Sequence, residues 1–460
     1  MGIEPERISI LNRNAVQKGD WVLYWMQQSQ RAHYNPALEY AISQANLLDL
    51  PVLVAFALTD SYPEANLRHY RFMLEGLAET RRQLAGRRIG MVVRKGDPAT
   101  AIGPLMDRSA LLVCDVGYTR HQRGWRQALA ASAPCRAIAV EGDVVVPVAT
   151  VSPKAEYAAR TIRPKIHKDL ERFLVPCPRY RPKRASIDSG MESLDLGAID
   201  PILEGLAIDR SVPAVTPFFK GGPGEAKKRL RRFIAQRLHH YEANRNQPQT
   251  DDISHMSPYL HFGQISPVFL ALQIADAPTG SPADRAAYLE ELIVRRELAA
   301  NFVHYTSDYD QYRCLPAWAQ RTLAEHAADR REIVYDRQAL EAANTHDPYW
   351  NAAMAEMRDT GFMHSYMRMY WGKKIIEWSP TPMQAFETSL ALNNRYFLDG
   401  RDPNSYAGVG WVFGLHDRAW FERGIFGKVR YMAASGLERK CDIRAYIEKV
   451  AAFSRRVGGR

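Results

Sequence analysis

The segment WVLYWMQQSQRAHYNPALEYAISQANLLDLPVLVAFAL, residues 21–58, indicates the architecture of the first part of the chain. Trp21–Met26 and Pro51–Leu58 are almost continuous apolar runs, which is typical of strands buried on both faces of a sheet. Between them, apolar residues near 36–48 recur at helical spacing. A strand, a helix and a second strand in this order predict a parallel pair in a doubly wound sheet.

The alternation of strands and helices continues to about residue 150. It predicts further strands at Ile89–Arg94, Ala110–Val116 and Arg136–Val140, and helices near 66–85, 98–108 and 120–131. This region contains neither a G-x-G-x-x-G nor a G-x-x-x-x-G-K-[ST] motif, which argues against a standard dinucleotide or P-loop phosphate site. A ligand of this Rossmann-like domain is therefore expected at the carboxyl edge of the sheet, where the strand order switches.

Two changes in composition divide the rest of the chain. Residues 151–222 are rich in proline and in basic residues, which predicts a long surface connector with short helices. Beyond it helical spacing predominates, as in Glu225–Tyr241, which has one apolar and one basic face. We therefore expect an α/β domain over residues 1–150, a connector over 151–222 and an all-α domain over 223–460.

The 460 residues are 46% hydrophobic and 24% charged, as in an ordinary globular protein. No apolar stretch approaches the roughly 20 residues of a membrane-spanning helix, and the first residues, MGIEPERISI, lack the apolar core of a secretion signal. Five scattered cysteines without a C-x-x-C pair are typical of a reducing compartment. We expect the cytoplasm and nucleoid, or the nucleus if the source is eukaryotic, and not secretion.

The net charge of +10, with a pI near 9.3, favours an anionic partner. Nucleic acid is favoured over a membrane because no basic amphipathic anchor is present. The sequence has no H-E-x-x-H, no G-x-S-x-G and no Cys–His zinc spacing, and its thirteen histidines are dispersed, so we expect no metal. His239 and His240 are interpreted as a surface pair on a helix. No heptad seam indicates more than a monomer.

Six of the nine tryptophans lie in the predicted all-α domain, at positions 318, 350, 371, 378, 411 and 420. Trp371 and Trp378 are seven residues apart, which places them on one helix face about 10 Å apart along the axis. Aromatic rings so spaced can relay electrons or stack on a flat ligand, with core packing as the alternative. Arg368 lies one turn before Trp371, and the LDGRDPN loop offers Asp399 and Asp402 as partner carboxylates. A purely structural ion pair is the alternative for Arg368.

Several sequence blocks resemble one family in the same order. They are VLYWMQQSQRAHYNPAL and RHYRFMLEGL in the α/β domain, EYAARTIRPKI in the connector, and SPYLHFGQIS, LEELIVRREL, TGFMHSYMRMYWGKKIIEW, LDGRDPNSYAG and GKVRYM in the helical domain. Over essentially its whole length the chain resembles the photolyase/cryptochrome flavoproteins, and specifically the class II cyclobutane pyrimidine dimer photolyases. Enzymes of this kind flip the damaged bases out of the duplex.

The resemblance implies FAD, bent into a U shape, inside the helical domain. The residues that it assigns to the phosphates, the ribityl chain and other FAD contacts are Tyr241, Ser254, His255, Met256 and Ser257. Arg368 and Asp399 match an ion pair beside the flavin N5 edge, where a cation favours the anionic reduced flavin. Asp402 is a further candidate for cofactor binding. Asn393 is the candidate amide facing N5, with its neighbour Asn394, or a mere helix-surface amide, as alternatives.

The resemblance also implies a lesion site. Glu291 matches the acid that hydrogen-bonds the damaged pyrimidines, a contact that stabilises charge present only after an electron arrives. A solvated helix glutamate is the alternative. The other residues expected near the lesion or the DNA are Met369, Trp411, Arg295 and Arg296. Val294 stands where the family often has an aromatic residue before Arg-Glu, which leaves the second pyrimidine face without an assigned partner.

Trp371 and Trp350 match the two-tryptophan electron relay of the class II branch, and Trp378 is either a side branch or core. The α/β domain of this family can hold an antenna pigment, a deazaflavin or a folate. His33, Tyr34 and Asn35 follow the first strand, where its pocket is expected, although loop polarity explains them equally well. Candidate phosphate contacts in the connector, or else solvated charges, are Lys154, Lys165, Arg181 and Lys183.

The function so implied is light-driven repair of DNA. Reduced FAD donates an electron to a flipped-out thymine dimer, the cyclobutane ring opens and the electron returns, so no nicotinamide site is needed. One alternative is a cryptochrome-like light sensor, which commonly has a longer C-terminal tail. A six-four photolyase, expected to use histidines at its lesion, is another. The third is a flavin-free nucleotide-binding α/β protein with a helical nucleic-acid-binding module.

Overall fold

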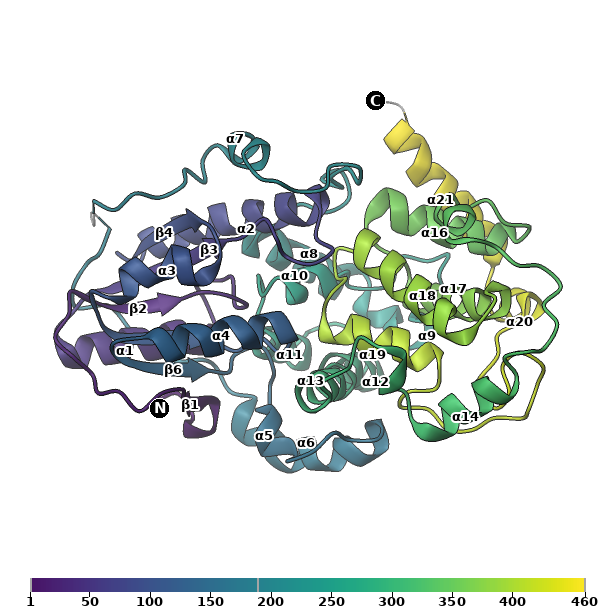
Figure 1. The fold of residues 1–460 in the computed structure, drawn as a ribbon, viewed down its shortest axis with the longest axis horizontal. Helices are drawn as coiled ribbons and strands as arrows, with labels where there is room; N and C mark the ends of the chain where they lie inside the picture. The colour runs from purple at the N-terminus through teal and green to yellow at the C-terminus, as the bar shows by residue number, and fades with distance from the viewer. Residues whose placement is uncertain (1, 188–189, 459–460) are drawn as a thin grey trace.

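The computed structural model describes residues 2–187 and 190–458 (Figure 1). An α/β body formed by the first third of the chain lies beside a helical body formed by most of the remainder. The chain between them runs along the outside, with α7 (Ile199–Glu204) on one edge of the view and α5 (Val148–Val151) and α6 (Ala159–Phe173) on the other. This arrangement confirms the predicted fold class. The domain boundaries at residues 150 and 222 stay our proposal.

The sheet has six strands in the order β1-β6-β5-β2-β3-β4. Their bounds are Ile8–Ile10 for β1, Trp21–Trp25 for β2, Val52–Leu58 for β3, Gly90–Lys95 for β4, Ser109–Asp115 for β5 and Arg136–Val140 for β6. Strands β2 to β6 run parallel, and β1 is antiparallel to β6. The order switches between β2 and β5, so the ligand crevice of such a sheet opens at the carboxyl ends of these strands.

The five predicted strands are confirmed to within one residue at each end. The predicted helices correspond to α1 (Pro36–Leu48), α2 (Leu67–Ala85), α3 (Pro98–Met106) and α4 (Arg120–Ser132). Strand β1 was not predicted, because three residues are too few to show a periodicity.

The connector covers the open edge of the sheet. Leu194 donates its backbone N–H to the Val93 carbonyl of β4 at 2.8 Å, and the Ser186 hydroxyl accepts from the Gly90 N–H at 2.7 Å. Such contacts satisfy backbone groups that an exposed edge strand would leave unpaired. The connector is thus part of the fold of the α/β body.

The rest of the chain is helical. Its α-helices are α8 (Pro223–Gln236), α9 (Tyr241–Asn244), α10 (Ser257–His261), α11 (Pro267–Ala275), α12 (Pro282–Leu289), α13 (Arg296–Tyr305), α14 (Ala317–Glu325), α15 (Arg337–Glu341), α16 (Pro348–Thr360), α17 (Ser365–Trp378), α18 (Pro382–Tyr396), α19 (Pro403–Val412), α20 (Ala434–Lys440) and α21 (Ile443–Gly458). A π-helical turn, Glu290–Arg295, joins α12 to α13. Such turns are frequent at functional sites.

The helix predicted over Glu225–Tyr241 is interrupted. Helix α8 ends at Gln236, and Arg237 leaves the helical conformation with φ −137° before a short turn leads into α9. The break lets Tyr241 pack edge-on against Phe233, with ring centroids 5.8 Å apart. Tertiary packing therefore overrides the apolar spacing that suggested one continuous helix.

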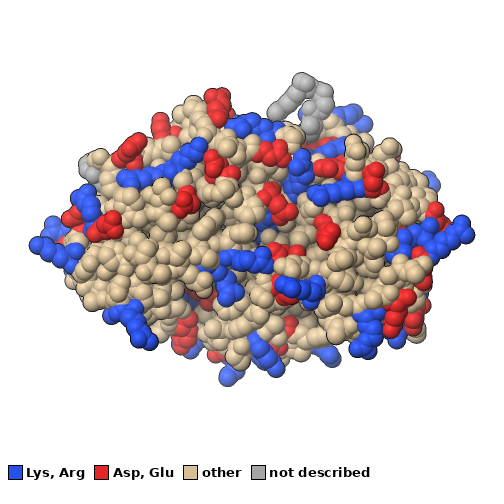
Figure 2. All heavy atoms as spheres, viewed as in Figure 1, with Lys and Arg blue, Asp and Glu red and all other residues tan. Residues whose placement is uncertain are grey.

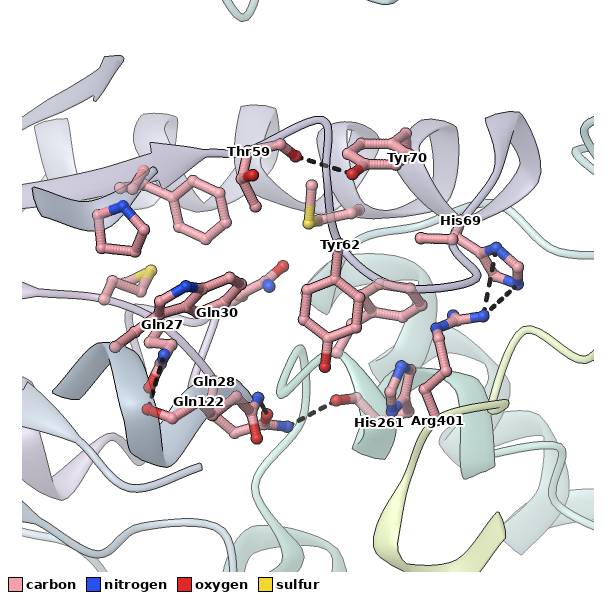
Figure 3. Close-up of a pocket in the computed structure, with 18 of the residues that line it drawn as sticks. Gln27, Gln28, Gln30, Thr59, Tyr62, His69, Tyr70, Gln122, His261 and Arg401 are labelled. Atoms are coloured by element: carbon pink, nitrogen blue, oxygen red, sulfur yellow. Dashed lines mark hydrogen bonds between the residues drawn. The ribbon is translucent and has the colours of Figure 1, made fainter. Parts of the chain in front are cut away.

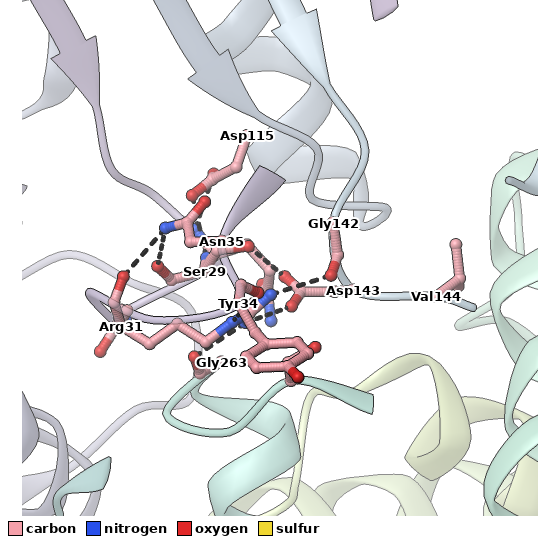
Figure 4. A network of polar contacts seen from close by, with 12 residues as sticks. Ser29, Arg31, Tyr34, Asn35, Asp115, Gly142, Asp143, Val144 and Gly263 are labelled. Atoms are coloured by element: carbon pink, nitrogen blue, oxygen red, sulfur yellow. Dashed lines mark hydrogen bonds and ion pairs between the residues drawn. The ribbon is translucent and has the colours of Figure 1, made fainter. Parts of the chain in front are cut away.

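A buried arginine fastens the two bodies together (Figure 4). Arg31 Nη1 donates to Asp143 Oδ1 at 2.6 Å and to the Gly263 carbonyl of the helical body at 2.9 Å. In the same network, the Asp115 carboxylate accepts the backbone N–H groups of Gln28 and Ser29, each at 2.9 Å. Burial raises the pKa of Asp115, and these donors partly offset that effect. The network fixes the loop that follows β2.

On the face shown in Figure 2, acidic and basic side chains are interspersed. Among the described residues, no helix has the length and apolar character needed to cross a membrane. The same residues contain no cluster of His, Cys, Asp and Glu side chains suited to a metal ion.

Candidate active site

The site is centred on Arg368 in α17 and Asp399 in the loop after α18. Arg368 Nη2 lies 3.0 Å from Asp399 Oδ2, and its Nε donates to the Met363 carbonyl at 3.0 Å. The guanidinium also lies over the Phe397 ring, 3.8 Å from its centroid, and 5.5 Å from that of Phe362. Three kinds of contact thus fix one partly buried cation, and the structure brings together the two residues that the sequence suggested as a pair.

Several buried polar atoms around this pair have no partner among the described residues. They are Asp399 Oδ1, His364 Nε2, His255 Nδ1 and Trp371 Nε1. Buried polar groups in native proteins are almost always hydrogen-bonded, so each unpaired one needs an explanation. These atoms are therefore available to hydrogen-bond a bound ligand.

His364 was not predicted as a site residue. Burial lowers its pKa to about 3, so the ring is neutral. Its Nδ1 accepts from the Tyr366 N–H at 3.2 Å, and this leaves Nε2 as a buried N–H donor without an acceptor. Only the three-dimensional surroundings reveal this role, although His364 lies within the TGFMHSYMRMYW block.

The predicted loop Ser254–Ser257 lies on the other side of Phe362. His255 adopts a left-handed backbone with φ +55°, and its Nε2 donates to Asp251 Oδ1 at 2.7 Å. Its ring packs edge-on against Phe362, with ring centroids 4.8 Å apart. A positive φ in a non-glycine residue is unfavourable and is typical of functional loops. Met256 of this loop is buried, and Ser257 begins α10.

Tyr241 and Ser254 are linked through a third side chain. The Tyr288 hydroxyl donates to Ser254 Oγ at 2.9 Å, and its ring contacts that of Tyr241 with centroids 5.1 Å apart. Both tyrosine rings are buried. Tyr241 therefore lies beside the Ser254–Ser257 loop, and its buried ring packs against that of Tyr288.

Asn393 and Asn394 lie in the last turn of α18 and are both buried. Asn393 Nδ2 donates to Asn394 Oδ1 at 2.9 Å and to Ser405 Oγ at 2.6 Å. Asn394 Nδ2 points instead to Glu64 of the α/β body. Within the part of the chain that the structure describes, the Asn393 oxygen therefore accepts no hydrogen bond, whereas both ends of the Asn394 amide are hydrogen-bonded.

Asp402 is used by the chain itself. Its Oδ1 accepts the Asn404 N–H at 2.8 Å and so caps the start of α19, and its Oδ2 lies 3.2 Å from His261 Nδ1. Capping of this kind stabilises a helix by about 1 kcal/mol. The sequence left both Asp399 and Asp402 open as partners of Arg368. In the structure Arg368 pairs with Asp399 and not with Asp402.

The tryptophans form a compact group. Trp350 in α16 stacks on Trp371 of α17, and Trp378 meets Trp350 edge-on with ring centroids 5.6 Å apart. All three are buried. Trp371 lies one turn after Arg368 in α17, so the group is contiguous with the site.

The residues expected near the lesion lie on two surfaces. Glu291 belongs to the π-helical turn, is exposed, and pairs with Arg245 at 2.7 Å. Arg295 pairs with Glu290 at 3.3 Å, whereas Arg296 donates to the Asp143 carbonyl of the α/β body. Arg296 thus has a structural contact across the interface, and Arg295 stays on the surface.

Met369 and Trp411 are half-buried and pack on the same helical core. Two basic side chains lie over the Trp411 ring, with Lys373 Nζ 5.4 Å and the Arg430 guanidinium 5.2 Å from its centroid. Burial lowers the pKa of Lys373 to about 7. Next to this group, Phe421 is 91% exposed, which is unusual for a large aromatic side chain.

A separate cavity opens where the sheet and the helical body meet (Figure 3). It begins at the carboxyl ends of β2 and β3, as the sequence predicted for a ligand of this domain. Its polar lining includes Gln27, Gln28, Gln30, Gln122, His261 and Arg401. His33 and Tyr34 line a much smaller hollow, and Asn35 caps α1, so the three residues suggested after the first strand do not line this cavity.

Known proteins with similar sequences indicate the family of this chain. A sequence model described as DNA photolyase matches residues 22–183. A protein from Methanothermobacter thermautotrophicus named deoxyribodipyrimidine photo-lyase is 48% identical, with 97% of this chain and 98% of that protein covered. One of the same name from Arabidopsis thaliana is 37% identical, with 98% and 94% covered.

Solved structures share the fold. A class III photolyase from Agrobacterium tumefaciens superposes with a TM-score of 0.73 at 17% identity, over 95% of this chain and 87% of its own. An archaeal photolyase from Sulfolobus tokodaii with two FAD molecules gives a TM-score of 0.69 at 15% identity, over 93% and 89%. The full-length identity to the photo-lyases decides the assignment: this chain belongs to the DNA photolyase family.

Proposed function

We propose that this protein repairs cyclobutane pyrimidine dimers in DNA with light, by electron transfer from reduced FAD. The observation that carries the proposal is the Arg368–Asp399 pair, surrounded by unpaired buried polar atoms and contiguous with the Trp350–Trp371 stack. A family relative that shares nearly half of the residues along the whole chain supports an enzyme over a light sensor of the same fold.

The residues present fit FAD. Asp399 Oδ1, His364 Nε2 and His255 Nδ1 are buried and unpaired, as expected where a long polar ligand supplies their partners. When bound, FAD supplies the absorbed photon energy and the electron that opens the cyclobutane ring. Arg368 holds a positive charge where the reduced, anionic ring system would lie, and Asp399 orients that cation. The Ser254–Ser257 loop and the N–H of His364 would hold the phosphates and the ribityl chain.

Asn393 would face the N5 edge with its carbonyl oxygen. Its two N–H protons are already donated to Asn394 and Ser405, so only Oδ1 is free to contact a ligand. Oδ1 can accept a hydrogen bond from a protonated N5 and not from an unprotonated one. This preference matches the reduced cofactor that the reaction requires.

The lesion would lie between Glu291 and the half-buried side chains of Met369 and Trp411. Glu291 would hydrogen-bond the pyrimidine carbonyls, and the charge that develops on the dimer makes this contact strongest after electron transfer. The Glu291 carboxylate is exposed, and among the described residues Arg245 is its one hydrogen-bonded partner, so it can change partner when DNA binds.

Phe421 would occupy the space left in the duplex by the flipped bases. It is 91% exposed, and the side chains of Arg418 and Arg430 stack on the neighbouring Trp420, at 4.7 and 4.1 Å from its centroid. An exposed apolar side chain among arginines is the arrangement by which proteins insert wedges between bases and hold the flanking phosphates. Of the connector residues, Lys183 instead contacts Asn46 of α1, and Lys165 pairs with Glu156.

Trp371 and Trp350 would carry electrons to oxidised FAD and so restore its active form. The stacked geometry of this pair supports the relay, and Trp378, which meets Trp350 edge-on, would be a side branch. The cavity of Figure 3 would hold a second chromophore, because it is lined by aromatic rings and amides suited to a flat polar heterocycle. We expect a monomer that acts in the compartment that holds the DNA.

The experiment that tests this function uses the purified protein and ultraviolet-irradiated DNA. The extracted cofactor is identified by its absorption and mass, and dimers are counted after incubation in light and in darkness. FAD together with light-dependent loss of dimers is the expected result. A protein without flavin would support the flavin-free alternative, and a flavoprotein that leaves dimers intact in light would support a sensor.

A further inference from the structure

The amide of Asn394 is held at both ends. Its Oδ1 accepts from Asn393 Nδ2 at 2.9 Å and from the Arg401 backbone N–H at 3.1 Å, and its Nδ2 donates to Glu64 Oε2 at 2.5 Å. The residue is completely buried. If this amide turned over, its oxygen would point at the Glu64 carboxylate and its nitrogen at two other donors. The contacts therefore allow one orientation only.

The orientation of Asn394 determines that of Asn393. Because Asn394 presents an oxygen, Asn393 has to direct its nitrogen toward it, and the second N–H of Asn393 goes to Ser405 Oγ. The Asn393 oxygen accepts no hydrogen bond from the described residues and is the end left for a ligand. One buried amide thus fixes the direction of the next.

The anchors of Asn394 come from both bodies of the molecule. Glu64 lies in the loop between β3 and α2 of the α/β body, and Arg401 follows α18 in the helical body. Arg401 Nη1 also donates to the Asn394 carbonyl at 2.6 Å and contacts the ring of the buried His69 at 3.1 Å. Glu64 and Arg401 both have a positive φ, +58° and +65°. Non-glycine residues adopt this conformation only where the surrounding structure imposes it.

We propose that Asn394, aligned by Glu64 and Arg401, is a positioning residue that fixes the Asn393 amide with its oxygen toward flavin N5. The inference rests on the proposed function, because it requires Asn393 to face the flavin. A fixed oxygen pairs only with the protonated N5 of reduced FAD. An amide free to turn over would also offer an N–H to the unprotonated N5 of oxidised FAD. The α/β body thereby raises the reduction potential of a cofactor bound in the helical body.

The test measures the midpoint potential of FAD bound to the full-length protein, by spectroelectrochemical titration. Asn394→Ala is expected to shift the equilibrium about tenfold toward oxidised FAD, which lowers a two-electron potential by about 30 mV. Glu64→Ala should shift it in the same direction by less. Glu64→Gln keeps a carbonyl acceptor for Asn394 Nδ2, so the midpoint potential of this variant should equal that of the wild type. Asn404→Ala is the matched control, because Asn404 is exposed and only its backbone N–H is bonded.

Asn393→Ala, measured in parallel, distinguishes a failure of the proposed function from a failure of the positioning role. If its potential equals that of the wild type, Asn393 does not face the flavin, and both that part of the proposed function and this inference are wrong. If Asn393→Ala lowers the potential but Asn394→Ala and Glu64→Ala behave like Asn404→Ala, the proposed function stands and the positioning role is refuted. Should Asn394→Ala not fold, the Glu64→Ala and Glu64→Gln pair decides, because the Glu64 side chain is exposed and its loss leaves no buried cavity.

Discussion

The indole rings of Trp350 and Trp371 lie almost parallel, with centroids 6.4 Å apart and planes inclined by 9°. Trp350 Nε1 also donates to the Trp371 carbonyl at 2.9 Å, so the stack is tied to the backbone of α17. Trp378 meets Trp350 at 67°. The mutual orientation of the first pair, together with its burial, distinguishes it from the other tryptophans of the helical body.

Replacing Trp371 with Phe tests the relay. The variant keeps an aromatic ring but loses the easily oxidised indole, and packing loss should cost about 1–3 kcal/mol. We expect it to fold and bind FAD, while light-driven reduction of oxidised flavin by an external reductant largely stops. Trp350→Phe should behave alike and Trp378→Phe more weakly. Repair by chemically reduced enzyme should persist, and normal photoreduction in Trp371→Phe would make this residue part of the core only.

Glu291→Ala tests the contact to the lesion. Loss of one hydrogen bond to a charged group, about 1.5–3 kcal/mol, should slow ring opening roughly tenfold or more and lower repair per absorbed photon. Binding of the dimer should weaken less, because the contact is strongest on the charged dimer. Glu290→Gln is the matched control, since Glu290 pairs with Arg163 and Arg295 instead. Weaker binding of the dimer with an unchanged repair yield per absorbed photon would reassign Glu291 to positioning.

Phe421→Ala tests the inserted side chain. Aromatic stacking against a base is worth about 1–3 kcal/mol, so affinity for dimer-containing duplex should fall roughly tenfold. Thermal stability should not change, because the side chain is exposed. Leu47→Ala, at an exposed apolar position of α1, should leave affinity unchanged. Equal affinities for wild type and Phe421→Ala would argue against insertion. The same titrations at several salt concentrations test the phosphate contacts, because an affinity independent of salt would contradict binding through phosphates.

Glu297 gives stability a distinctive pH dependence. It is buried and accepts the Val145 N–H at 2.5 Å, and burial raises its pKa to about 8 from an ordinary value of 4.5. Between these values the folded state keeps a proton that the unfolded chain releases. This stabilisation is therefore full below pH 4.5 and is lost as the pH rises through 8, by up to about 1.4 kcal/mol per pH unit.

Glu297→Gln is neutral at every pH and keeps an oxygen for the Val145 N–H. We expect its urea midpoint to exceed that of the wild type above pH 8 and to approach it near pH 5. The difference between the two curves isolates this group, because all others titrate in both proteins. Parallel curves from pH 5 to 9 would show that Glu297 is ionised in the folded protein.

The sequence predicted the sheet because its strands are continuous apolar runs, a signal that survives without tertiary information. It did not predict β1, which is too short, or the break at Arg237, which is set by the packing of Tyr241. Asp399 is 31 residues from Arg368, and only the family resemblance, not spacing, selected it over Asp402. The free N–H of His364 and the direction of the Asn393 amide depend on neighbours from other segments, including Glu64, and no local pattern contains them.

The most direct test of light-driven dimer repair compares two otherwise identical duplexes. One contains a single cyclobutane thymine dimer and the other a six-four photoproduct. Fully reduced, FAD-loaded protein is illuminated with blue light, a matched sample is kept in darkness, and intact thymines are measured by chromatography. We expect thymines to be restored from the cyclobutane dimer in light only, with the six-four duplex unchanged. Repair of the six-four lesion, or no restoration of the cyclobutane dimer by the reduced flavoprotein in light, would contradict the proposed function.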